Sequence, residues 1–279
     1  MSDRQANVGE TDLEKIGGRS LKARQHGLTV STLGVGEDYN EALMAEIAIQ
    51  GGGRYYHIQA AQQISAYLTG ELGEAANLAA RNTILLIDLP AESVLVPLSA
   101  AYPAEMVGSQ ASVSVGDIPC EVEMEIPLRL TLFSQQAGAR LSLDGQVTFQ
   151  SPAGNLLSSP LNRVTVRFLS DKEFTLREGQ VLPTAERVIR HLHAAQVLST
   201  SRAMASSLQA GAQQATIGID ALRSYAEMVG TGNAQKCLNE LQEDFRVMAA
   251  SPAQAKTHVA AAFRVHRSSK DFHKPDKDS

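Results

Sequence analysis

The chain has 279 residues and a mass of 29.9 kDa, enough for two or three domains of ordinary size. Hydrophobic residues make up 43% and charged residues 20% of it, which is typical of a soluble globular protein and excludes a fibrous or wholly disordered one. The net charge of -5 argues against a general electrostatic grip on nucleic acid or anionic lipid. We therefore expect no nucleic-acid partner.

Cysteine usage and hydropathy indicate the compartment. Cys120 and Cys237 are too few for a disulfide framework and lack the paired spacing of a zinc site, so we expect both to be small core residues. No apolar run is long enough to span a membrane, and the N-terminal residues contain no hydrophobic signal segment. The expected location is therefore cytoplasmic. This is a default, because truncation of the N-terminus would remove a signal sequence.

Residues 3–80 alternate between helical and strand-like patterns. Helix, strand, helix, strand, helix is the order of a doubly wound α/β sheet, although two parallel strands do not sustain such a sheet alone. The predicted elements are a helix from the cap at 11–14 to Gly27, a strand over 28–36, a helix from about Asn40 to the glycines at 51–53, a strand over 54–58 and a helix marked by Ile64, Tyr67, Leu68 and Leu72.

Residues 81–171 change to a period of two. The alternation is clearest over 122–132, where Met124 and Leu130 belong to the apolar parity and Glu121, Glu123 and Glu125 to the polar one. Val164 and Val166 continue the apolar parity later in the chain. Turn residues separate the runs, so we predict antiparallel strands with one solvated face that close into a small β-sandwich.

Beyond Gly179 the sequence is rich in alanine and predicts amphipathic helices. One opens at Pro183, a second carries Ile217, Ala221 and Leu222, and a third carries the stripe from Leu238 to Met248. Gly211 and the segment Gly230-Thr231-Gly232 are interpreted as short connectors, which favours a small helical bundle.

The fold class expected is a multi-domain α+β protein. It comprises a partial α/β Rossmann-like segment, an antiparallel β-sandwich and a C-terminal helical bundle. The expected boundaries are 1–76, 81–172 and 181–263, followed by a charged, disordered tail over 264–279.

Four short segments carry a family resemblance. They are DRQANVGETD at 3–12, VSTLGVG at 30–36, DYNE at 38–41 and GGRYY at 52–56. In order and spacing they resemble the later half of a von Willebrand factor type A domain, over roughly residues 1–76. The wider layout resembles bacterial proteins in which that domain precedes a β-sandwich and a helical tail, here in an N-terminally truncated form.

The resemblance implies an adhesion or assembly module whose Mg²⁺ is held by a DxSxS motif, a Thr and a later Asp. Only the last element has a counterpart, Asp3, which is followed by Arg4, and the chain contains no Asp-x-Ser-x-Ser. One carboxylate beside a guanidinium does not suit an ion that prefers six oxygens. We expect an incomplete metal-ion-dependent adhesion site, with Asp3 a vestigial metal residue, no cofactor in this chain, and Mg²⁺ only in a full-length relative.

Other candidate constellations do not indicate catalysis. His191 and His193 are two apart on a predicted helix, so they point to different faces and are expected to be solvated. Gly34 and Gly36 follow a strand, but Tyr39 stands where a dinucleotide loop would need its third glycine. The sequence has no nucleophile elbow and no positioned Cys–His pair, so we expect a protein that is not an enzyme.

The leading hypothesis is a non-enzymatic protein–protein interaction or scaffold protein with an unknown protein partner. The alternatives are a regulatory subunit of a metal-chelatase-like or transport ATPase assembly, and a gene fragment without independent function. Because strands near Val30 and Tyr56 lack their usual neighbours, we also expect either self-association through the exposed N-terminal sheet edge or local disorder there.

Overall fold

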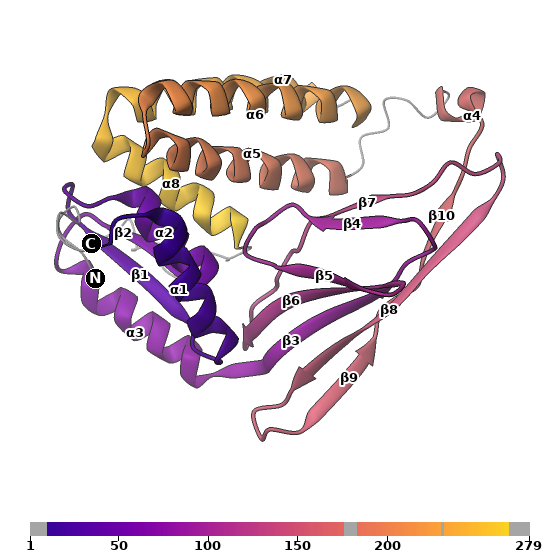
Figure 1. The fold of residues 1–279 in the computed structure, drawn as a ribbon, viewed down its shortest axis with the longest axis horizontal. Helices are drawn as coiled ribbons and strands as arrows, with labels where there is room; N and C mark the ends of the chain where they lie inside the picture. The colour runs from indigo at the N-terminus through magenta and orange to yellow at the C-terminus, as the bar shows by residue number, and fades with distance from the viewer. Residues whose placement is uncertain (1–9, 176–182, 230–231, 268–279) are drawn as a thin grey trace. The chain divides into compact units, whose positions relative to one another are not determined.

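The computed structural model describes residues 10–175, 183–229 and 232–267, and it shows a mixed α/β fold (Figure 1). The described residues divide into two compact units. The first joins the residues up to Gly73 to those from Pro183 onward, and the second begins at Glu74 and ends at Thr175. Each unit has its own hydrophobic core.

The first unit begins with the helices and strands that the sequence predicts. Asp12 caps the first helix, and Asn40 caps the second by accepting a hydrogen bond from the Leu43 backbone N–H at 3.0 Å. Gly51 ends the second helix. The elements are α1 (Leu13–Gln25), β1 (Val30–Val35), α2 (Glu41–Gln50), β2 (Gly52–Ile58) and α3 (Gln63–Ala76).

Strands β1 and β2 pair in parallel, with helices on both faces. On one face the Thr32 hydroxyl donates to the Met44 carbonyl of α2 at 2.8 Å, and on the other the Ser31 hydroxyl donates to Glu71 of α3 at 2.6 Å. Gly53 is required at the pairing, because a Cβ there would lie 2.3 Å from the Val30 carbonyl oxygen. Leu28 was predicted within this strand but precedes it and is 62% exposed.

The described C-terminal residues form four helices where the sequence indicates three. The additional helix begins at the Ser251 cap with Pro252 in its first turn, a start signal that the alanine-rich pattern obscured. It ends at His266, so the segment 264–266 is helical rather than part of a disordered tail; residues 268–279 lie outside the described part. The helices are α5 (Pro183–Met204), α6 (Leu208–Val229), α7 (Gly232–Ala250) and α8 (Pro252–His266).

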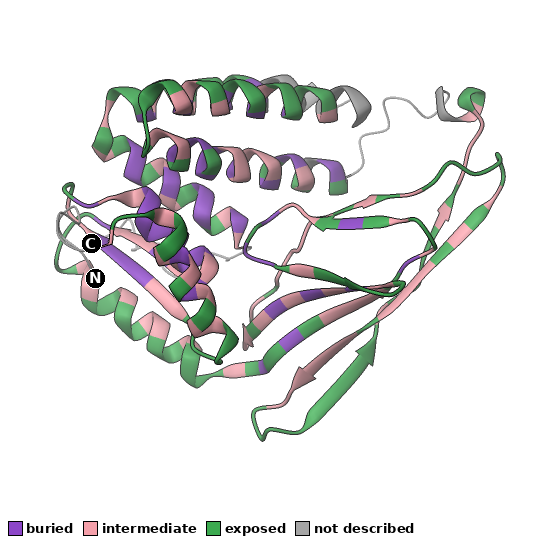
Figure 2. Cartoon of the chain, in the orientation of Figure 1, coloured by how far each residue is buried: buried purple, intermediate pink, exposed green. Residues whose placement is uncertain are grey.

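These helices share one core with the α/β elements (Figure 2). Val259 and Phe263 of α8 are 0% and 1% exposed, and the Phe263 ring lies 5.9 Å from the ring of Tyr55 in β2. The sequence divides 1–76 from 181–263, whereas the structure combines them. The physical reason is that α2 and β2 present apolar surface that α8 and α5 cover.

Helix α6 buries only part of the apolar stripe that was expected: Leu222 is 1% exposed, as predicted. Ile217 was assigned to the apolar stripe but is 61% exposed, and Ala221 is exposed as well. Gly211 was interpreted as a connector, yet it lies inside α6, where a Cβ would come within 2.2 Å of Met204 of α5. Small residues therefore let α5 and α6 approach closely. The buried positions are Gly211, Ala215, Gly218 and Leu222.

The second unit is built from antiparallel strands. A six-stranded sheet has the order β10-β8-β3-β6-β5, with β9 also paired to β8, and β4 pairs with β7 in a separate two-stranded sheet. The elements are β3 (Leu78–Asp88), β4 (Val94–Pro97), β5 (Ala104–Val107), β6 (Gln110–Pro119), β7 (Leu128–Thr131), β8 (Arg140–Gln150), β9 (Leu156–Pro160), β10 (Val164–Arg167) and the short helix α4 (Asp171–Thr175).

The predicted parity holds over 122–132, although the predicted strand does not. Met124 and Leu130 pack against the core of this unit as expected. Regular pairing covers only the four residues of β7 and begins after Pro127, which has no N–H to donate to a ladder. Glu121, Glu123 and Glu125 therefore do not share a strand face. Val164, assigned to the inner face, is 55% exposed.

Candidate interaction pocket

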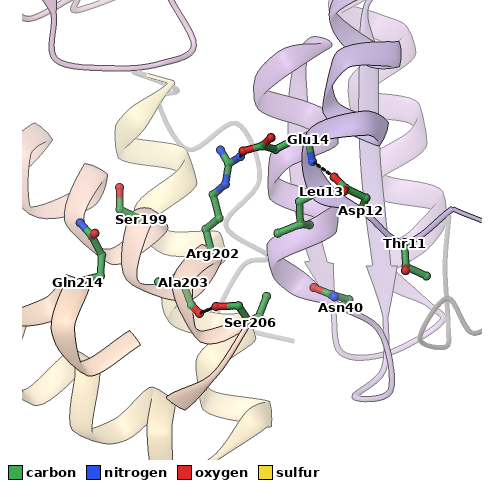
Figure 3. Close-up of a pocket in the computed structure, with 11 residues that line it drawn as sticks. Thr11, Asp12, Leu13, Glu14, Asn40, Ser199, Arg202, Ala203, Ser206 and Gln214 are labelled. Atoms are coloured by element: carbon green, nitrogen blue, oxygen red, sulfur yellow. Dashed lines mark hydrogen bonds and ion pairs between the residues drawn. The ribbon is translucent and has the colours of Figure 1, made fainter. Parts of the chain in front are cut away.

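A pocket of about 590 Å³ lies in the first unit, where β1 has ended and α2 begins (Figure 3). Ligands of open α/β sheets bind outside the carboxyl ends of the strands, so this is the edge where a site is expected. One wall is the start of α1 with the cap of α2, and the other is the junction of α5 and α6. The lining residues are Thr11, Asp12, Leu13, Glu14, Asn40, Ser199, Arg202, Ala203, Ala205, Ser206 and Gln214.

Arg202 of α5 extends across the pocket toward the first turn of α1 (Figure 3). Its Nη1 donates to Glu46 Oε2 of α2 at 3.1 Å, and its Nη2 lies 3.8 Å from Glu14 Oε1. Glu46 is only 6% exposed, and its other oxygen accepts a hydrogen bond from Gln50 Nε2 at 3.0 Å. The guanidinium is thus fixed in place by a buried carboxylate and joins C-terminal helix α5 to both α1 and α2.

The capping side chains of the pocket already have backbone partners. Asp12 Oδ1 accepts from the backbone N–H of Glu14 at 2.9 Å and of Lys15 at 3.1 Å. The hydrogen bond from Lys15 lowers the pKa of the Asp12 carboxyl below its usual value, so this group stays charged at neutral pH. The Glu14 side chain is 86% exposed at the rim. The pocket therefore presents carboxylates beside one fixed cation.

This arrangement does not fit the divalent ion that the family resemblance implies. Mg²⁺ needs several oxygens in an octahedral array, whereas the side-chain oxygens of Asp12 and Asn40 accept hydrogen bonds as helix caps. Arg202 also places a positive charge between the walls of the pocket. In the described residues, no group of three or more His, Cys, Asp or Glu side chains is placed to hold a metal ion. Asp3 itself lies outside the described part of the chain, so its role stays a prediction.

A second polar cluster joins the loop after β1, strand β2 and helix α8. The Tyr39 hydroxyl lies 2.7 Å from both the Tyr55 hydroxyl and His57 Nδ1. Lys256 Nζ lies 3.3 Å from Glu41 Oε2 and 5.1 Å from the centre of the Tyr39 ring. Burial raises the pKa of both tyrosines, so they remain protonated donors. Gly34 leaves the space that the Tyr39 ring fills.

The predicted histidine pair is not solvated. His191 is 5% exposed, and His193 Nε2 lies 2.9 Å from Asp244 Oδ2 of α7. His258 of α8 approaches the other oxygen of Asp244 at 2.8 Å. The spacing argument is right that His191 and His193 point in different directions, but the helix is surrounded by α7 and α8, so both directions lead into the unit.

The remaining positions discussed from the sequence are two cysteines and the glycine after β1. Cys120 is half-buried at the end of β6 rather than in the core, and the side chain of Cys237 lies outside the described part. Gly36 has a φ of +75° and leads from β1 into the loop, as its strand-end interpretation requires. None of the helices in the described ranges is long and apolar enough to cross a membrane.

Sequence reasoning missed Glu46, Arg202 and Lys256, the charged residues that join the two ends of the chain. Glu46 stands in the mostly apolar stretch EALMAEIAIQ, and Lys256 lies among the alanines of α8. A charge within an apolar helical face indicates a buried partner, because an unpaired buried charge is costly. The partners themselves were hidden, since they lie more than 150 residues away.

The chain was compared with known protein families and with curated proteins. No model of a known protein family matches the chain. A curated relative, the uncharacterized protein YfbK of Escherichia coli (strain K12), is 29% identical over 141 residues, which are 49% of this chain and 24% of that protein. The chain thus spans about a quarter of the length of the curated relative it matches.

Two solved structures are similar over 94% of the chain. A von Willebrand factor type A protein from Catenulispora acidiphila has a TM-score of 0.61 at 12% identity, with 63% of its own length covered. The human COPII-coat protein Sec24c has a TM-score of 0.52 at 9% identity, with 37% covered. The resemblance to von Willebrand factor type A proteins is therefore confirmed at the level of the fold.

Proposed function

We propose that the chain is a non-enzymatic protein-interaction module that receives a polar segment of a partner protein in the pocket between α1, α2, α5 and α6. The observation that carries the proposal is Arg202, which a buried carboxylate holds at 3.1 Å within a pocket large enough for several side chains. The likeness to a von Willebrand factor type A structure supports it, since such folds suggest protein interaction.

The proposed contact needs no divalent ion. Asp12 and Asn40 are engaged as caps, so the pocket offers hydrogen bonds and charges from Glu14, Arg202 and the hydroxyls of its walls rather than an open coordination position. Partner binding is then expected to be the same with Mg²⁺ and with a chelator. As a separate part of the proposal, the antiparallel strands of the second unit form a β-sandwich, and the C-terminal helices of the first unit form a helical bundle.

The test is recovery of partner proteins on the immobilised full chain from a lysate of cells that express it. Ser199→Arg places a long side chain in the pocket and is expected to abolish recovery; Thr216→Arg adds the same charge at an exposed position of α6 that does not line the pocket. Equal recovery by wild type and Ser199→Arg would overturn the proposal.

The alternative, a regulatory subunit of a metal-chelatase-like or transport ATPase assembly, predicts that recovery depends on added nucleotide. Self-association through the N-terminal sheet edge is a separate proposal: within the described residues β1 pairs only with β2. Slow hydrogen exchange throughout 29–35 in a dilute monomer would contradict it.

A further inference from the structure

Strand β9 forms an open edge in the second unit, and all five of its residues are exposed (Figure 2). In the described part of the chain β9 pairs only with β8. Leu156 is 77% exposed and Leu157 is 46% exposed, which is unusual for leucines on a sheet. An open edge with exposed apolar side chains is a template for a further strand.

The edge carries no charge to protect it. From Gly145 to Asn162 the sequence GQVTFQSPAGNLLSSPLN contains no charged residue, and the flanking Asp144 and Arg163 pair with each other at 2.7 Å. Natural edge strands are commonly guarded by lysines or inward-pointing charges. Residues 145–162, which include all of β9, have no such charged guard, so side-chain charge does not prevent another strand from pairing with this edge.

Hydrogen bonds at both ends of the hairpin define which groups face outward. Leu161 N–H donates to Gly145 O at 2.9 Å, and Ser151 N–H donates to Asn155 O at 2.9 Å. Because the backbone groups of a strand alternate in direction, Leu157 and Ser159 also face β8, and Leu156, Ser158 and Pro160 face outward. Pro160 therefore occupies a position where its missing N–H removes no bond to β8.

We propose that β9 pairs with β9 of a second copy of this chain, antiparallel about a two-fold axis through Ser158. Ser158 then lies opposite Ser158 of the second copy, and Leu156 lies opposite Pro160, with about four backbone hydrogen bonds between the strands. On the other face Leu157 lies opposite Ser159. This interface is independent of the pocket in the first unit.

Charge does not oppose a second copy as the occupant of this edge. Each chain has a net charge of -5, so two copies repel wherever carboxylates meet. The charge-free hairpin is a surface at which they can meet without placing like charges opposite each other, and the two-fold register needs no complementary sequence from another protein.

Sedimentation equilibrium of the full chain between low and high micromolar concentration tests the proposal. The apparent mass of wild type is expected to rise from 29.9 kDa toward twice that value. Ser158→Pro removes an outward N–H without breaking the bonds to β8, and Leu156→Lys adds a charge at an exposed edge position; both are expected to remain monomeric.

Ala153→Lys is the matched control, because it adds the same charge in the exposed turn and is expected to associate like wild type. Circular dichroism shows whether each variant is folded. If Ser158→Pro does not fold, Leu156→Lys still tests the proposal. A monomeric wild type at every concentration, or a dimer that persists in Leu156→Lys, would overturn the proposal. The latter result would direct attention to another interface.

Discussion

The ammonium group of Lys256 lies 3.3 Å from the carboxylate of Glu41, although 215 residues separate the two in the chain. The Lys256 side chain is 3% exposed and that of Glu41 is 23% exposed. A nearly buried cation therefore holds helix α8 against the start of α2. This ion pair is one of the contacts through which the two ends of the chain become one unit.

Removing either partner is expected to have unequal effects. Glu41→Ala leaves Lys256 buried without its carboxylate, and we expect the free energy of unfolding to fall by about 3 kcal/mol. Lys256→Met keeps most of the apolar stem and leaves only a partly exposed carboxylate, so its cost is expected to be smaller. Urea denaturation measures both. A larger loss for Lys256→Met would show that solvent does not compensate the Glu41 carboxylate for the loss of Lys256.

Adjacent glycines in α1 provide a sensitive test of the α1–α2 contact. A Cβ at Gly17 would lie 2.9 Å from Glu46 Oε1, whereas a Cβ at Gly18 has nothing within 4 Å. Gly18→Ala is expected to raise the free energy of unfolding by about 0.5–1 kcal/mol through helix propensity. Gly17→Ala is expected to lower it, because it displaces the carboxylate that holds Arg202. The same gain from both changes, measured by thermal unfolding, would contradict the packing.

Val113 and Val107 allow a buried and an exposed valine of the second unit to be compared. Val113 is fully buried in β6 and Val107 is 68% exposed in β5. Val113→Ala is expected to cost about 2 kcal/mol, since it leaves a cavity, and Val107→Ala less than about 0.5 kcal/mol. Denaturation followed by circular dichroism separates them. Similar losses of stability for the two variants would mean that Val113 is not buried, or that Val107 is not exposed, in the folded protein.

His266 links stability to pH. Burial lowers the pKa of its imidazole from 6.5 to about 4, so the folded state keeps it neutral. Below pH 6.5 the unfolded state binds a proton that the folded state does not, and stability is expected to fall between pH 6.5 and 4, by up to about 3 kcal/mol. His266→Phe removes this dependence. A wild-type protein as stable at pH 4.5 as at pH 7.5, by urea midpoint, would rule out the neutral buried histidine.

The sequence predicts the local elements well where a cap, a period and a stop agree. The segment from Asp12 to Ile58 carries all three signals, and its helices and strands lie within two or three residues of their predicted ends. The parity of Met124 and Leu130 was also readable, because it reflects burial rather than pairing.

The long-range organisation was not predictable from the same signals. Helix α8 is rich in alanine, so its stripe is weak, yet Val259 and Phe263 complete the core of the first unit. Gly211 was interpreted as a connector because a sequence does not distinguish a connector from a close helix contact. The pocket was hidden for a related reason, since its two walls come from opposite ends of the chain.

The α/β segment and the C-terminal helices form one unit, and the pocket exists only because they do. Native-state hydrogen exchange of wild type and of Phe263→Ala, resolved by peptide, tests it most directly. We predict that β2 and α8 open with similar free energies and that Phe263→Ala lowers both together while leaving β3 and β6 unchanged. Rapid exchange of α8 beside an unaltered β2 would show that the C-terminal helices and the α/β segment are separate units.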